Sequence, residues 1–153
     1  MMKIIIVVFL LFINVGCKKE STNINNVVTP ISKLHKLASQ GNLKAYSDLS
    51  LAYMDSPNDI NFCKTSKSVA EKYNFDEAYL NLYYCQIDYY HRANYMNLDD
   101  LNHETIIKAM NYLAIGNSLG NKECSKLLGK YFIQGKYLNK DIEKGKLLIQ
   151  QNE

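Results

Sequence analysis

The sequence contains no tryptophan, only two prolines and only seven glycines in its 153 residues. So little proline and glycine excludes a collagen-like chain and a proline-rich linker, and it disfavours sandwiches and barrels, which need frequent turns. The hydrophobic share of 47% and the charged share of 22% exclude a disordered chain. A formal net charge of +3 is too small to indicate a nucleic-acid binder. We therefore expect one domain of long helices joined by short loops.

Sequence signatures of catalysis and metal binding are also lacking. His35, His91 and His103 do not have the H-E-x-x-H spacing of a zinc site, and neither a phosphate-binding loop nor a C-x-x-C pair occurs. Asp88 and His91 can pair on one helix, which is ordinary for a solvated helix surface. Because no set of residues meets the geometric needs of catalysis, we expect no enzyme activity, no catalytic residue, no metal and no cofactor.

The chain begins with a short apolar run. Lys3 precedes ten consecutive apolar residues, Ile4 to Ile13. As a helix these rise only about 15 Å, half of the ~30 Å hydrocarbon core of a bilayer. The run therefore predicts a secretory signal peptide rather than a transmembrane helix.

The segment that ends this run, Asn14-Val15-Gly16-Cys17, resembles the lipobox of bacterial lipoproteins, although Asn14 stands where that family prefers leucine. The resemblance implies that residues 1–16 are a signal peptide, that Cys17 is lipidated, and that residues 17–30 form a tether. A plain signal peptide with a chance cysteine is the alternative. Lys18 replaces the aspartate of the inner-membrane sorting rule, which favours the outer membrane, facing the periplasm. Export would also permit disulfides.

From residue 31 onward, apolar residues recur with helical spacing. The period predicts seven helices, over residues 31–40, 42–54, 59–73, 75–92, 102–118, 121–134 and 141–151. Gly41-Asn42 and Gly120-Asn121 each combine a helix stop with the cap of the next helix, and Asn139 is placed to cap the last one. Loops this short predict antiparallel neighbours.

A repeat is visible along these helices. The segment from Gly120 places Cys124 at a small position, followed by Leu128-Gly129, Tyr131, Gly135, Asp141 and Lys144-Gly145. This pattern resembles the Sel1-like repeat, a tetratricopeptide-type hairpin, and weaker copies start near residues 41 and 74. The starts are separated by 33 and 46 residues, with an insertion over 93–101. The resemblance implies an all-α fold over residues 31–153, a short right-handed α-solenoid of antiparallel helical hairpins.

The cysteines allow one pairing within the helices. Cys63 and Cys85 each lie 11 residues from Asn74, where we expect the turn between two antiparallel helices. Equal distance from the turn places both at the same height, within reach of a disulfide. Two buried thiols are the alternative interpretation. Cys124 is expected to be a buried, unpaired thiol.

Tyrosines gather on the fourth predicted helix. Tyr79, Tyr83 and Tyr90 share one face, while the opposite face carries apolar residues for the core. Because tyrosine combines a large contact area with a polar tip, this face can be a protein-binding groove. Ordinary packing between hairpins is the other interpretation, and the sequence alone does not separate the two.

The function that these resemblances imply is an envelope lipoprotein that acts as a protein–protein interaction module. One concrete version is an immunity or inhibitor protein that captures a toxin or enzyme in the periplasm. Its partners would be a protein and, through the lipid anchor, the membrane, but not a nucleic acid. A structural scaffold of an envelope complex and a periplasmic hydrolase are the alternatives.

Overall fold

A computed structural model describes residues 29–55, 57, 59–87 and 98–151. The leader with Cys17, and also Asp88, Tyr90 and His91, lie outside the described residues. Within them the structure is all-helical, as predicted, with seven α-helices and one 3-10 turn. The elements are α1 (Ile31–Ser39), α2 (Leu43–Asp55), α3 (Phe62–Tyr73), α4 (Asp76–Gln86), η1 (Leu98–Asp100), α5 (His103–Ser118), α6 (Lys122–Gln134) and α7 (Ile142–Gln150).

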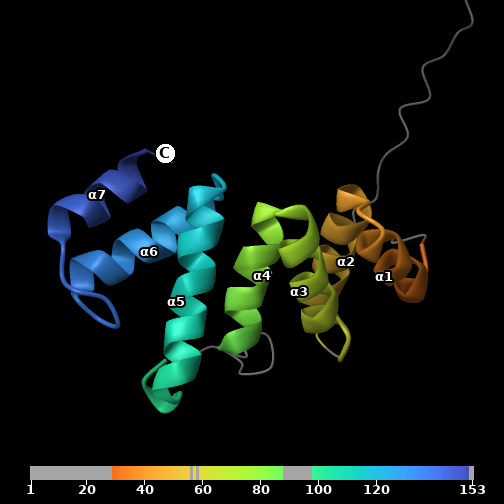
Figure 1. The fold of residues 1–153 in the computed structure, drawn as a ribbon, viewed down its shortest axis with the longest axis horizontal. Helices are drawn as coiled ribbons and strands as arrows, with labels where there is room; N and C mark the ends of the chain where they lie inside the picture. Colours follow the sequence, from red (N-terminus) through yellow and green to blue (C-terminus); the bar gives the residue numbers. More distant parts are fainter. Residues whose placement is uncertain (1–28, 56, 58, 88–97, 152–153) are drawn as a thin grey trace, which may run out of the picture.

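The helices follow one another along the longest axis of the molecule, from α1 at one end to α7 at the other (Figure 1). Each helix packs against the next one in the chain, and α1 also packs against α3. Between α1 and α2, between α3 and α4, and between α5 and α6, this order follows from short loops, because a helix that must return at once lies beside the helix it follows.

Two of the turns between helices have the same structure. Gly41 and Gly120 adopt φ angles of +93° and +92°, a region that glycine enters without strain. The amide of the following asparagine donates to Leu37 O in one turn and to Gly116 O in the other, at 3.0 and 2.9 Å. The side chains of Asn42 and Asn121 then cap the next helices, each accepting an amide at 2.9 Å. The predicted stop-and-start turns are confirmed.

Three helices bury side chains in one register. The buried positions are Ala45, Tyr46, Leu49 and Ser50 in α2, Ala78, Tyr79, Leu82 and Tyr83 in α4, and Cys124, Ser125, Leu128 and Gly129 in α6. They are separated by the 33 and 46 residues found between the repeat starts. The helices α2, α4 and α6 therefore turn equivalent faces toward the core.

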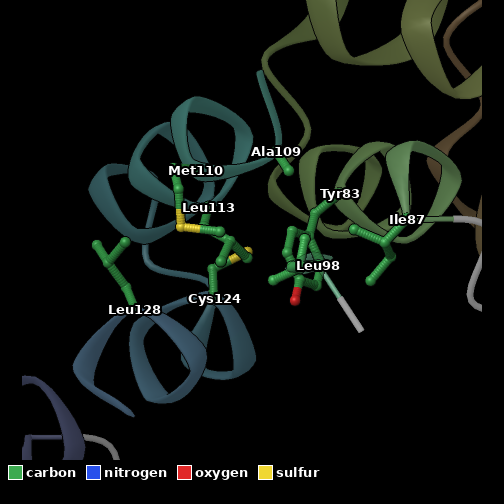
Figure 2. Packing of buried hydrophobic residues seen from close by; sticks show 8 residues of the cluster. All are labelled: Tyr83, Ile87, Leu98, Ala109, Met110, Leu113, Cys124 and Leu128. Atoms are coloured by element: carbon green, nitrogen blue, oxygen red, sulfur yellow. The ribbon is translucent and has the colours of Figure 1, made fainter. Parts of the chain in front are cut away.

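The hydrophobic core consists of three clusters in chain order rather than one centre. The first surrounds Phe62 between α1, α2 and α3, and the second surrounds Val69 and Ala78. The third lies between α4 and the α5–α6 pair, where Tyr83 meets Leu113 and Cys124 (Figure 2). Leu98 of η1 is 3% exposed and completes this cluster.

One predicted helix start and one predicted helix cap are wrong. α3 begins at Phe62 instead of Asp59, because Asp59 accepts two hydrogen bonds from the residues that follow it. The Asn61 amide donates to the Asp59 carboxylate at 3.0 Å, and the Phe62 amide donates to the Asp59 carbonyl oxygen at 3.1 Å. This is a turn, and it directs the Asp59 side chain away from helix capping. Asp141 rather than Asn139 caps α7, accepting the Lys144 amide at 3.0 Å. α4 ends at Gln86, and residues 88–92 of the predicted helix lie outside the described residues.

Candidate functional site: the groove between α1 and α3

The predicted cysteine pair is present as a disulfide. Cys63 on α3 is bonded to Cys85 on α4, with 5.9 Å between their Cα atoms. The two residues lie at equal height in the α3–α4 hairpin, as their distance from Asn74 predicts. The bond fixes α3, which forms one wall of the groove described below, to the helix behind it.

The interpretation of Tyr79 and Tyr83 as an exposed protein-binding face is wrong. Their side chains are 8% and 0% exposed. Tyr79 lies against the ring of Tyr112 on α5, with 6.4 Å between centroids, and the Tyr83 hydroxyl shares a 2.7 Å hydrogen bond with that of Tyr131 on α6. The sequence pattern predicts one buried face for α4, but neighbouring helices cover α4 on several sides. Packing between neighbouring helices is the interpretation that holds for both residues.

An open pocket lies between α1 and α3. Its volume is about 430 Å³, in the range of small-ligand and side-chain pockets. The lining residues are Ser32, His35 and Ser39 of α1, Asn61 before α3, and Lys64, Thr65 and Ser68 of α3. Spacings of three and four residues place each set along one face of its helix. We call this pocket and its two walls the α1–α3 groove.

A chain of hydrogen bonds crosses the groove from Asp59 through His35 to Thr65. His35 Nδ1 lies 2.7 Å from Thr65 Oγ1, and His35 Nε2 contacts the carboxylate of Asp59. Because an ionised carboxylate only accepts, it selects the imidazole tautomer with the proton on Nε2. In neutral His35, Nδ1 then accepts the Thr65 hydroxyl proton. The chain links α1, the turn before α3, and α3.

A buried polar network supports the groove from below. The Tyr46 hydroxyl donates to Ser66 Oγ at 2.8 Å, and Ser66 Oγ donates to the Phe62 carbonyl oxygen at 3.0 Å. From α4, Asn81 Nδ2 donates to the Tyr46 hydroxyl and to Ser50 Oγ, both at 3.0 Å. All buried side-chain polar atoms in the described part of the chain have partners. This network therefore holds α2, α3 and α4 in one arrangement behind the groove.

Charge is divided unevenly between the helices of the N-terminal half. α1 and α3 together carry five lysines and one glutamate, a formal charge of +4 with neutral His35. α2 and α4 together carry one lysine and four acids, a formal charge of −3. The groove therefore lies between the two basic helices.

The segment Gly116-Asn117-Ser118-Leu119-Gly120 has the G-x-S-x-G spacing of hydrolase nucleophile turns, which the sequence analysis passed over. Such a turn requires a strand followed by a helix. Here Ser118 is the last residue of α5, is exposed, and donates to the Ile115 carbonyl oxygen at 2.7 Å. The spacing therefore has no nucleophile geometry.

The free thiol of Cys124 is buried at the centre of the third cluster (Figure 2). Burial, helped by the negative charges of Asp76 and Glu123, raises the pKa of the Cys124 thiol to about 12. Only the thiolate reacts with alkylating reagents. We therefore expect native Cys124 to react with iodoacetamide at pH 8 at least about a thousandfold more slowly than an exposed cysteine. Peptide mass spectrometry measures this rate, and rapid labelling of the native protein would contradict the buried placement.

The same raised pKa predicts a loss of stability in alkali. The native state holds the thiol proton more tightly than the unfolded chain, whose thiol titrates near 9.0. The free energy of unfolding should therefore fall as the pH rises above that value. Burial also raises the pKa of Tyr83 and Tyr131, so these add to the loss. Urea midpoints between about pH 8 and about pH 11 test this, and Cys124→Ala should flatten part of the slope. A constant midpoint would contradict it.

Sequence reasoning missed the grouping of His35, Asp59 and Thr65. His35 is separated by 24 residues from Asp59 and by 30 residues from Thr65, and no local motif connects it to them. The sequence signal was weak, because the grouping depends on a turn before α3 and on the packing of α1 against α3. Of the other residues singled out, His103 is exposed at the start of α5, and Glu104 forms an ion pair with Lys108 at 2.8 Å.

The described residues contain neither a candidate metal site nor a candidate membrane span. No group of three or more histidine, cysteine or acidic side chains there is placed to hold a metal ion. No helix in this part of the chain has both the length and the apolar character needed to cross a membrane. Comparison with protein-family models, with curated proteins and with solved structures finds no match to this chain.

Proposed function

We propose that this protein is a short right-handed solenoid of antiparallel helical hairpins that binds another protein through the α1–α3 groove. The observation that carries the proposal is the groove itself, an open pocket between two alternate helices whose lining is made of hydroxyl, amide, imidazole and ammonium groups. Such groups can donate to the carbonyl and carboxylate oxygens of a bound chain.

Three features support the solenoid arrangement. The helices α2, α4 and α6 bury one register, and two of the turns have the same hydrogen bonds. Alternate helices are also in contact through side chains: Asn81 of α4 reaches Ser50 of α2, and Tyr83 of α4 reaches Tyr131 of α6. In repeat proteins, helices stacked in this way present an extended binding surface.

The proposal places the protein in the cell envelope, anchored through a lipid on Cys17 and facing the periplasm from the outer membrane. The lipobox-like segment supports this location, and so does the Cys63–Cys85 disulfide, because disulfides persist in oxidising compartments. An immunity protein that captures a toxin or enzyme is the concrete form of this function. A Cys17→Ser variant that stays in the membrane fraction would reject the lipid anchor.

Site-specific photocrosslinking in intact cells tests the binding surface. A photoreactive residue at Ser68 in the groove should give one dominant protein adduct, identified by mass spectrometry. The control is the same residue at Lys44, whose side chain is 83% exposed on α2. Adducts at Ser68 and not at Lys44 support the groove as the binding surface. If no adduct forms, or if both positions give the same set of adducts, the groove is rejected as the binding surface. Adducts with many different envelope proteins at both positions would indicate a scaffold.

The Asp59–His35–Thr65 chain favours a second candidate function, hydrolysis of an ester or amide. The Thr65 hydroxyl oxygen would attack the acyl carbon while its proton passes to His35 Nδ1, and Asp59 would hold the imidazole. His35 would then return the proton to the leaving alcohol or amine. Water would hydrolyse the acyl-threonine, releasing the acid and restoring the hydroxyl.

A fluorophosphonate probe distinguishes this candidate. Hydrolytic function predicts a covalent adduct at Thr65 that is lost in His35→Gln, while Ser68→Ala, which changes another hydroxyl of the same groove, keeps it. Thr65→Ser should retain the adduct, because serine supplies the same nucleophile. A native protein that takes up no probe at Thr65 rejects hydrolysis.

A further inference from the structure

We infer that the α1–α3 groove selects an acidic segment, rich in aspartate and glutamate, of its protein partner. This inference rests on the proposed function only in taking the groove as the binding surface. It adds the chemical class of the partner, which the proposed function leaves open.

The lysines of the two groove walls point to this class. Lys64 lines the groove, and helical spacing places Lys36 on the face of Ser32 and Lys72 on the face of Ser68. Positive charge therefore lies on both walls and along the length of α3.

The acids near the groove are already engaged. Asp59 contacts His35, and the only acid on α3, Glu71, lies 3.8 Å from Lys67. Among the described residues, neither Lys36 nor Lys64 forms an ion pair with a carboxylate. The positive potential of the groove is therefore not cancelled locally, and the low dielectric constant of the protein walls on both sides of the cleft concentrates it.

The neutral lining of the groove fits the same ligand. The hydroxyls of Ser32, Ser39 and Ser68 and the amide of Asn61 can donate to carboxylate oxygens and to backbone carbonyls. Such short side chains leave room for a glutamate or aspartate side chain to enter. An apolar segment would leave these donors without partners, which is costly when they are desolvated.

The two acidic helices, α2 and α4, give the groove its selectivity. α2 and α4 carry Asp48, Asp55, Asp76 and Glu77 against a single lysine. An acidic segment is therefore attracted to α1 and α3 and repelled by α2 and α4. This asymmetry orients the approach of the partner and raises its association rate.

Fluorescence anisotropy with labelled peptides tests the inference on the purified full chain. One probe is an alternating glutamate–serine peptide of about ten residues, and its control replaces each glutamate with glutamine. We expect saturable binding of the acidic peptide only, weakened about tenfold or more between about 0.02 M and about 0.2 M salt. Equal affinity for both peptides would overturn the inference.

Charge variants locate the binding. Lys64→Glu and Ser68→Asp each place a negative charge in the groove and should weaken binding of the acidic peptide about tenfold. Lys44→Glu on α2 makes the same charge change as Lys64→Glu, and Ser118→Asp on α5 matches Ser68→Asp. Both controls should stay within about twofold of the original affinity. Equal losses in groove and control variants would overturn the inference, because they would show a response to net charge alone.

Two outcomes distinguish this inference from the alternatives, a membrane surface and a partner segment that is not acidic. Binding to vesicles with about one third phosphatidylglycerol, lost in Lys64→Glu and without peptide binding, would overturn it in favour of a membrane surface. A crosslink from Ser68 to a segment that is not acidic would also overturn it while the proposed function stands. If no crosslink forms at Ser68, the proposed function itself fails.

Discussion

Replacement of Cys63 and Cys85 by alanine is expected to lower the free energy of unfolding by about 3 kcal/mol, because the disulfide closes a loop with a sequence separation of 22 residues and so restricts the unfolded chain. The loss should appear as a lower urea midpoint, followed by far-UV circular dichroism. Both cysteines are partly buried beside the first core cluster, so alanine leaves little polar mismatch.

The reduced wild-type protein is the matched comparison. Its urea midpoint should fall to that of Cys63→Ala/Cys85→Ala, while addition of dithiothreitol should leave the double variant unchanged. An oxidised wild type no more stable than the double variant would contradict the prediction. Since the bond fixes α3 to α4, its reduction should also lower the affinity of the groove for the acidic peptide. Fluorescence anisotropy of the labelled peptide, measured with and without dithiothreitol, tests this effect.

The sequence predicts the helices and turns of this fold well because their causes are local. Apolar spacing of three and four residues marks a helix wherever it lies, and glycine followed by asparagine ends one helix and caps the next. Gly41-Asn42 and Gly120-Asn121 act through neighbours within five residues. The disulfide was also within reach of sequence reasoning, because the geometry of a single hairpin determines it.

The candidate site depends on contacts that no local pattern encodes. His35, Asp59 and Thr65 meet because α1 packs against α3, two helices further along the chain. The interpretation of Tyr79 and Tyr83 as a protein-binding face failed for the same reason. A helical wheel separates a core face from an outer face, but α4 has neighbours on several sides. Tyr79 and Tyr83 are therefore buried although they lie on the face opposite the predicted core face. Placement of hairpins relative to one another is the information that one sequence does not supply.

A similar limit applies to the small residues of α6 and α7. The repeat pattern predicts small residues at Gly129 and Gly145, but not that they face each other. A Cβ atom added to Gly145 would lie 2.6 Å from the Gly129 carbonyl oxygen and 2.6 Å from Ile133 Cγ1. One added to Gly129 would lie 2.7 Å from the Gly145 carbonyl oxygen. The two helices therefore cross with backbones in contact, which accounts for glycine on both sides of the crossing.

Gly145→Ala is expected to lower the free energy of unfolding by about 2 kcal/mol. Alanine favours a helix over glycine by about 1 kcal/mol, so an open site would gain stability. Here the added methyl group meets backbone on α6, which cannot turn aside as a side chain would, and overpacking costs about 1 to 3 kcal/mol. Because the main helix neighbour of α7 is α6, the strain should separate α7 first. Hydrogen exchange should accelerate in Ile142–Gln150 more than elsewhere.

Gly120→Ala provides the control, because it makes the same chemical change where nothing lies within 4 Å of the new methyl group. Its φ of +92° penalises any residue with a Cβ atom, so some stability is lost through backbone strain alone. That strain lies between α5 and α6, so exchange in α7 should not change. If Gly145→Ala stabilises the protein, or if both variants accelerate exchange in α7 equally, the close crossing of α6 and α7 is not what requires glycine there.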